Sequence, residues 1–132
     1  MCGANHFSFM SSGGESIRMC GFAARARNGI AVNALWPRTT IATAAIKNLL
    51  GGDEVMRRSR IPDIVADAAH AIFAKPAKDF TGNFLIDDTF LAGEGVADFA
   101  RYRVDAREPL QPDFFVPDSI PPPPGVSVAP RV

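Results

Sequence analysis

Residues 30–36 form an almost uninterrupted apolar run, which predicts a strand that is buried on both faces. It reads Ile-Ala-Val-Asn-Ala-Leu-Trp, so Asn33 is its only polar residue. Such a pattern is typical of an interior strand in a parallel sheet that helices cover on both sides. Pro37 has no N–H group for a strand ladder and therefore predicts the end of this strand.

A second strand is predicted at residues 83–87, and a helix of about three turns precedes it. Pro62 and Asp63 suit the first turn of that helix, and Lys75-Pro76 predicts its end. Its apolar stripe consists of Ile64, Val65, Ala68, Ala69, Ile72 and Phe73. A strand–helix–strand unit with a right-handed crossover places its two strands parallel, so the pattern predicts an α/β fold.

Two further helices are predicted. The first covers residues 15–27 and ends at Asn28-Gly29, and the second covers residues 40–50 and ends at Gly51-Gly52. Residues 53–60 are polar and basic, so we expect them to cover the surface.

The composition changes at about residue 103. Eight of the 11 prolines lie between Pro109 and Pro130. The run Pro121–Pro124 predicts polyproline II or disorder. We therefore expect the packed part of the chain to span about residues 15–100.

Composition excludes several classes of function. The chain has 132 residues, enough for one small domain, and its 14 basic and 14 acidic residues balance without a basic block, so no nucleic-acid partner is predicted. No apolar run reaches the roughly 20 residues of a membrane span, and neither end carries a secretory or peroxisomal signal. Two distant cysteines suggest a reduced, cytoplasmic protein, and the scattered histidines and cysteines predict no metal site.

The residues after the first strand are the best candidates for ligand binding. Arg38, Thr39, Thr40 and Thr43 follow its carboxyl end, where ligands bind in open α/β sheets. Hydroxyls and backbone N–H groups there suit a phosphate or a carboxamide, although an ordinary strand-to-helix turn remains the alternative. His70 shares a helix face with Asp67 and is predicted to face solvent. His6 has no recognisable partner, and Asp87-Asp88 is interpreted as a turn.

Several motifs resemble one enzyme family. The stretch VNALWPRTTIAT resembles the strand and turn that follow the catalytic helix of short-chain dehydrogenase/reductases, and its Trp-Pro-Arg-Thr is most similar to their hydroxysteroid dehydrogenase-like branch. The resemblance continues through DIVADAAHAIFAKP, FTGNFLIDD and EPLQPDFF, and so covers residues 29–116. It implies the C-terminal portion of a Rossmann-like, doubly wound parallel sheet, with about two parallel strands and flanking helices. Residues 1–28 match poorly, residues 29–102 form the dehydrogenase part, and residues 103–132 form a proline-rich tail.

The resemblance also implies a site. NAD or NADP would be contacted by the turn, whose residues are Pro37, Arg38, Thr39, Thr40 and Thr43. Arg38 stands where glycine is usual in the family. Thr43 best matches the family threonine, although this sequence has one more residue than the family between the matched proline, Pro37, and that threonine. The helix of residues 40–50 matches the mobile substrate lid. Its apolar side would then hold a lipophilic alcohol or carbonyl through Ile41, Ile46, Leu49 and Leu50. Plain core packing of these four residues is an equal alternative.

The catalytic parts of the family are missing from the sequence. No glycine-rich turn follows a strand, and Phe7 and Ser8 stand where the family's catalytic tyrosine is expected. Tyr102 has no lysine four residues later. We therefore expect no catalytic residue in this chain, an inactive isolated chain and weak cofactor binding. Two alternatives are a non-catalytic α/β module that pairs with itself or another chain through residues 62–87, and a truncated or misassembled reading frame.

Overall fold

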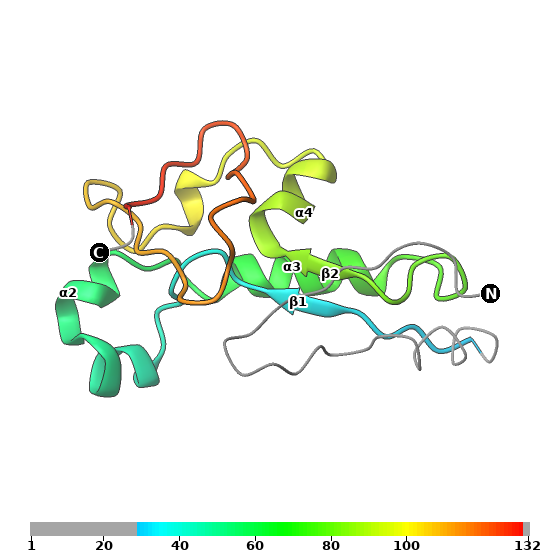
Figure 1. The fold of residues 1–132 in the computed structure, drawn as a ribbon, viewed down its shortest axis with the longest axis horizontal. Coiled ribbons are helices and arrows are strands. Elements are labelled where there is room, and N and C mark those ends of the chain that lie inside the picture. The colour runs from blue at the N-terminus through cyan, green and yellow to red at the C-terminus, as the bar shows by residue number, and fades with distance from the viewer. Residues whose placement is uncertain (1–28, 131–132) are drawn as a thin grey trace.

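The computed structural model describes residues 29–130, so the helix predicted at residues 15–27 lies outside the described residues. Figure 1 shows a long helix, α3, running beside a small sheet, with α4 and the C-terminal loops stacked over one end of the sheet and α2 set to one side. The elements are β1 (Ala34–Trp36), η2 (Ile46–Leu50), α2 (Gly52–Arg57), α3 (Asp63–Phe73), β2 (Phe84–Ile86), α4 (Asp87–Gly93) and η3 (Ala100–Tyr102).

The sheet consists of β1 and β2, which pair in parallel as predicted, with Leu35 opposite Leu85. Each strand has 3 residues, fewer than the sequence pattern predicts. Upstream of β1, side chains replace part of the strand ladder. The Asn33 side-chain oxygen accepts hydrogen bonds from the backbone N–H of Asn83 at 3.1 Å and from its side-chain amide at 2.8 Å. The segments therefore stay side by side beyond the short strands.

Thr39 and Ile41 form isolated β-bridges with Pro112 and Arg60, so the predicted start of a helix at residue 40 is wrong. The Arg60 N–H donates to the Thr40 carbonyl at 3.0 Å, and the Ala42 N–H donates to the Arg60 carbonyl at 2.8 Å. On the other side, the Thr40 N–H donates to the Gln111 carbonyl at 3.0 Å. Successive β-branched residues favour this extended backbone, and the helical turns begin only at Ala44.

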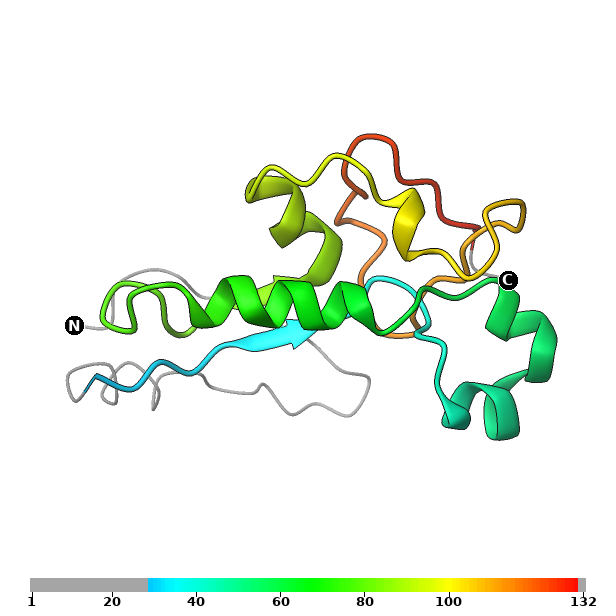
Figure 2. The same ribbon diagram turned by 180° about the vertical axis from the view of Figure 1, so that it is seen from behind.

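The core lies between α3, α4 and η3. Its buried cluster is Ile64, Ala68, Leu91, Phe99 and Tyr102. The predicted helix of residues 63–73 is confirmed, and three members of its stripe, Ile64, Ala68 and Ile72, are buried. Phe73, the last member of the stripe, is 85% exposed. Figure 2 shows α3 lying along the sheet as the helix that connects its two strands.

Two segments are more buried than the sequence pattern predicts. Ser59 and Arg60 are fully buried, so only the first part of residues 53–60 covers the surface as expected. The expectation that packing ends near residue 100 is wrong, because Tyr102, Leu110 and Val116 are buried. The Asp113 N–H also donates to the Arg38 carbonyl at 2.9 Å, which ties the tail to the sheet edge. The division of the chain at residue 103 stays a prediction.

Candidate functional site

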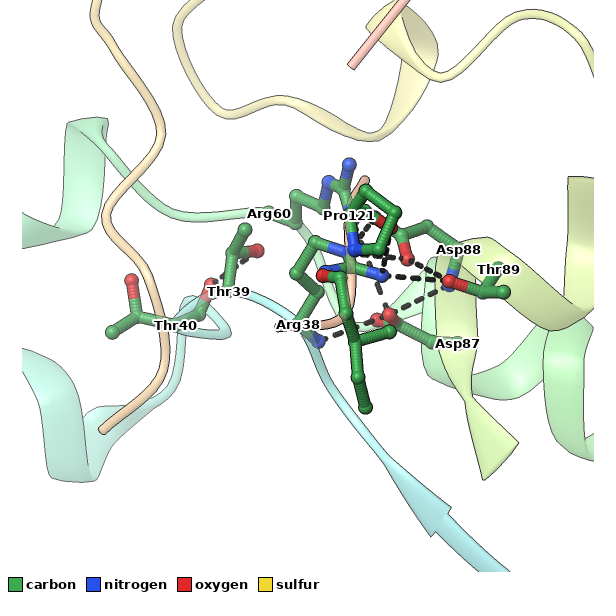
Figure 3. Close-up of polar contacts among 9 residues, drawn as sticks. Arg38, Thr39, Thr40, Arg60, Asp87, Asp88, Thr89 and Pro121 are labelled. Carbon is green, nitrogen blue, oxygen red and sulfur yellow. Dashed lines mark hydrogen bonds and ion pairs between the residues drawn. The ribbon is translucent and has the colours of Figure 1, made fainter. Parts of the chain in front are cut away.

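Four charged side chains are buried together where the two parallel strands end. Arg38 follows β1 after Pro37, while Asp87 and Asp88 open α4 directly after β2. Because parallel strands end at the same edge of a sheet, these residues meet there. Arg60 reaches the same point from the segment before α3, and Figure 3 shows both arginines converging on the two carboxylates. We call these four residues the buried charge cluster.

Arg38 is the most highly connected member of the cluster. Its Nε donates to both oxygens of Asp88 at 2.8 and 2.9 Å, and its Nη2 donates to the Thr89 hydroxyl at 2.6 Å. Its remaining donors bind the tail, with Nη1 2.8 Å from the Ile120 carbonyl and Nη2 3.2 Å from the Pro121 carbonyl. Arg38 therefore locks the tail to the carboxyl end of the sheet.

Asp87 has an unusual protonation equilibrium. Its Oδ1 accepts the N–H of Arg38 at 3.0 Å and the N–H of Asp88 at 2.7 Å, while its Oδ2 has no hydrogen-bond partner among the described residues. Burial, helped by the neighbouring Asp88 carboxylate, raises the pKa of Asp87 to about 6, against the lowering effects of the hydrogen bond from the Arg38 N–H and the charge of Arg60. Asp87 therefore changes charge close to neutral pH.

The interpretation of Asp87-Asp88 as a turn is wrong. Both residues belong to the first turn of α4, where carboxylates complement the helix dipole, and both are fully buried. Sequence reasoning missed these two residues and Arg60 as members of a site. The available signal was a pair of acids placed directly after a buried strand, at the sheet edge where Arg38 was already expected.

The predicted cofactor residues divide into two groups. Arg38, Thr39 and Thr40 are buried, whereas Pro37 is half-buried and Thr43 is exposed. The Thr40 hydroxyl lies 2.7 Å from the Ser59 hydroxyl, which itself donates to the Val55 carbonyl at 2.6 Å. Because Ser59 has one proton to donate, Thr40 is the donor of the pair. The polar groups that remain accessible to a ligand at this turn lie around Thr43.

The four predicted lid residues do not share one surface. Ile46 is buried and Ile41 packs against the core, whereas Leu49 is 81% exposed and Leu50 is 54% exposed. Core packing thus accounts for two of them. The other two form an apolar end of η2, and their assignment to a substrate pocket stays a prediction.

His6 lies outside the described residues, and His70 lies outside the buried charge cluster. His70 is exposed on α3, as predicted. Within residues 29–130, no group of three or more His, Cys, Asp or Glu side chains could hold a metal ion. Across the same range, every helix is too short or too polar to cross a bilayer.

Comparison with known proteins identifies strong similarity over most of the chain. No protein-family profile matches it. It is 48% identical to hydroxysteroid dehydrogenase-like protein 2 of Xenopus tropicalis over 87% of this chain and 27% of the relative. The Homo sapiens protein of the same name is 50% identical over 78% of this chain and 24% of its own length. The chain therefore spans about a quarter of the length of these curated relatives.

Solved structures show the same relationship. A protein assigned as a dehydrogenase, from Xanthomonas campestris, superposes with a TM-score of 0.68 at 48% identity, covering 76% of this chain and 36% of its own. A short chain dehydrogenase from Mycobacterium thermoresistibile superposes with a TM-score of 0.66 at 46% identity, covering 84% of this chain and 39% of its own. In both sequence and fold, the chain therefore resembles part of a short-chain dehydrogenase of the hydroxysteroid dehydrogenase-like branch, which confirms the resemblance inferred from its motifs.

Proposed function

We propose that this chain contributes the nicotinamide-facing turn and the substrate lid of a short-chain NAD(P)-dependent oxidoreductase that acts on an alcohol or a carbonyl. The observation that carries the proposal is the parallel pairing of β1 and β2, whose carboxyl ends open onto residues 37–43. Ligands of open α/β sheets bind at that edge. The similarity to dehydrogenases over most of the chain points to the same ligand class.

NAD or NADP would lie against Pro37 and Thr43, because these are the members of the turn that solvent reaches. Thr43 offers a hydroxyl, while the buried charge cluster holds the backbone of Arg38 in place from the opposite side. When bound, the cofactor would supply the hydride chemistry. Proton transfer would depend on a group outside this sequence, since its one tyrosine, Tyr102, has no lysine four residues later.

The substrate in this proposal is lipophilic. Leu49 and Leu50 expose large apolar side chains at the end of η2, directly before Gly51, which separates η2 from α2. Such surface is costly to leave in water and favours contact with an apolar ligand or a neighbouring chain. The cytoplasm as the site of action is also part of the proposal, and it rests on the two distant cysteines.

The test begins with thermal melting of the 132-residue chain in the presence of NAD, NADH, NADP and NADPH. In parallel, residues 29–130 replace the matching segment of the Homo sapiens hydroxysteroid dehydrogenase-like protein 2. We expect the chimera to bind a nicotinamide nucleotide, and Thr43→Val to weaken that binding while His70→Ala, an exposed change on α3, leaves it unaltered. A folded chimera that binds none of the four nucleotides, beside an unaltered relative that does, would contradict the proposal.

The second candidate function is a non-catalytic interaction module, and the exposure of Phe73 favours it. This aromatic side chain stands 85% exposed at the end of α3, within the residues 62–87 that we expect to form a contact between chains. A two-stranded sheet also leaves strand edges that another chain can pair with. Sedimentation of the unaltered chain and of Phe73→Ser tests this reading. An association that Phe73→Ser abolishes supports it, and a monomer at all concentrations contradicts it.

A further inference from the structure

Arg60 carries two hydrogen-bond donors that the buried charge cluster does not use. The side chain is fully buried, and its Nη1 lies 3.1 Å from Oδ2 of Asp88 and 4.0 Å from Oδ1 of Asp87. Its Nε and Nη2 have no hydrogen-bond partner among the described residues. A buried donor without a partner destabilises the fold, and more so when the group is charged. Two such donors on one guanidinium therefore point to a ligand.

The Arg60 side chain also lines a small pocket of about 50 Å³, to which the tail contributes Gly125. Arg103, which pairs with Arg60 in an antiparallel bridge, also lines the pocket, and Val126 follows Gly125 in its wall. The Phe99 ring forms an apolar wall, and its centroid is 5.9 Å from the Arg60 guanidinium carbon. All other lining residues are apolar, so no carboxylate faces the pocket. We call it the Arg60–Arg103 pocket.

Arg103, which is half-buried, adds a third free donor and a positive charge that no carboxylate pairs with among residues 29–130. Its buried Nε has no partner among residues 29–130, and its Nη2 donates to the Glu108 carbonyl, which carries no charge. No ion pair joins Arg103 to a carboxylate in the part of the chain that the structure describes. The two arginines and two aspartates of the buried charge cluster offset one another, so the charge of Arg103 leaves the pocket positive.

The direction of the donors selects the shape of the ligand. Nε and Nη2 of a guanidinium lie on one edge and donate in parallel, which matches two oxygens of one oxyanion. Nε of Arg103, the bridge partner of Arg60, adds a third donor, which needs a third oxygen. A carboxylate has only two oxygens and so leaves one of the three donors without an acceptor. A chloride ion offers a single acceptor atom and does not match the two parallel donors of Arg60. Water satisfies N–H groups but leaves the positive charge uncompensated.

We propose that the Arg60–Arg103 pocket binds a phosphate-sized tetrahedral oxyanion, with two oxygens on the Nε–Nη2 edge of Arg60 and a third on Nε of Arg103. The oxyanion is either free phosphate or the phosphoryl end of a larger molecule. Bound there, the oxyanion links the segment before α3 to the tail, because Arg60 of that segment and Gly125 of the tail both line the pocket. The proposal is independent of any nicotinamide site.

The experiment measures phosphate binding to the unaltered 132-residue chain by line broadening in ³¹P NMR and by thermal melting. Inorganic phosphate and ribose 5-phosphate are titrated separately, with sodium chloride at matched ionic strength as the reference. Arg103→Gln removes the third donor and the unmatched charge. Arg107→Gln is the matched control, because its side chain is 89% exposed and pairs with Asp105 outside the pocket.

We expect a saturable rise in melting temperature with phosphate that chloride does not give. Affinity should fall at least about tenfold in Arg103→Gln and stay unchanged in Arg107→Gln. Binding of phosphate alone identifies a free ion, and binding of both compounds identifies a phosphoryl group; either result supports the proposal. Equal effects of phosphate and chloride, or equal affinities in the two variants, would overturn it. If Arg103→Gln fails to fold, an absence of phosphate line broadening with the unaltered chain overturns it equally.

Discussion

The Nε atom of Arg38 lies 2.8 and 2.9 Å from the two carboxylate oxygens of Asp88, and both side chains are withdrawn from water. One residue follows the first strand and the other follows the second, so this contact fastens the carboxyl ends of β1 and β2 to each other.

Replacing Arg38 by methionine should lower the free energy of unfolding by about 3–5 kcal/mol, because it leaves a buried carboxylate short of its main partner. It also leaves the Ile120 and Pro121 carbonyls without their donor. Urea unfolding measures the change. Lys75→Met is the control. The Lys75–Glu94 pair, at 2.7 Å, is partly exposed, so its loss should lower the free energy of unfolding by no more than about 1 kcal/mol. Equal losses in the two variants would show that the buried pair contributes nothing special.

Stability should fall as pH rises through the range in which Asp87 titrates. Its pKa in the folded chain is raised from 3.8 to about 6, so folding takes up protons between these values. The stabilisation of the folded chain that comes from protonated Asp87 is fully present below about pH 4 and is lost as the pH rises through about 6. At about 1.4 kcal/mol for each pH unit, the loss is roughly 3 kcal/mol.

Asp87→Asn isolates this effect, because asparagine stays neutral and still accepts the Arg38 N–H. The stability of the variant relative to the unaltered chain should rise between pH 4 and pH 7. Urea unfolding at several pH values measures it, with Asp79→Asn, an exposed carboxylate, as the control. Parallel pH profiles for Asp87→Asn and the unaltered chain would contradict the raised pKa.

Thr40→Val should cost about 1–2 kcal/mol, because the buried hydroxyl donates to Ser59 at 2.7 Å. Thr40→Ser keeps the hydroxyl and should recover part of the loss. Thr43→Val, at an exposed position, should stay within about 0.5 kcal/mol. Thermal melting of the three variants separates the structural threonine from the accessible one. A larger loss at Thr43 than at Thr40 would reverse this assignment.

Gly51 and Gly52 should differ in their tolerance of alanine. Both have positive φ, at 151° and 63°, but a Cβ atom on Gly51 would lie 2.2 Å from Cγ2 of Val55, whereas nothing lies within 4 Å of one on Gly52. Gly52→Ala should cost about 1–2 kcal/mol from backbone strain alone, and Gly51→Ala should cost more. Adding Val55→Ala should recover part of the second loss. Urea unfolding that ranks the two glycines in the opposite order would contradict the clash.

The periodic parts of the fold were predictable from the sequence, because local pattern determines them. The apolar stripe with Pro62 and Asp63 at its start identified α3, and the two apolar runs identified a parallel pair of strands. The start of the next helix was not predictable from that pattern. Residues 39–42 are not helical because Arg60 and Gln111 supply hydrogen-bond partners from distant parts of the chain, and these tertiary hydrogen bonds override a local helical stripe.

The candidate site was predictable in place but not in composition. The rule for open α/β sheets located it at the end of the first strand, where Arg38 lies. It could not show that Arg38 faces inward, because that follows from Asp88 lying opposite it at the end of the second strand. The packing of the tail could not be predicted for the same reason. Its prolines lack N–H donors, but the carbonyls of Ile120 and Pro121 are good acceptors for a buried arginine.

The contacts between Arg38 and the tail have a consequence for biosynthesis. Arg38 and its carbonyl acceptors are 82 and 83 residues apart in the chain. Because a polypeptide leaves the ribosome from its N-terminus, Arg38 and both aspartates emerge well before the groups that complete their hydrogen bonds. Contacts of such long sequence separation also form slowly, since the intervening chain must first be ordered. The nascent chain therefore carries an unfinished ionic interior until residue 121 emerges, and a pause before that point leaves it open to misfolding.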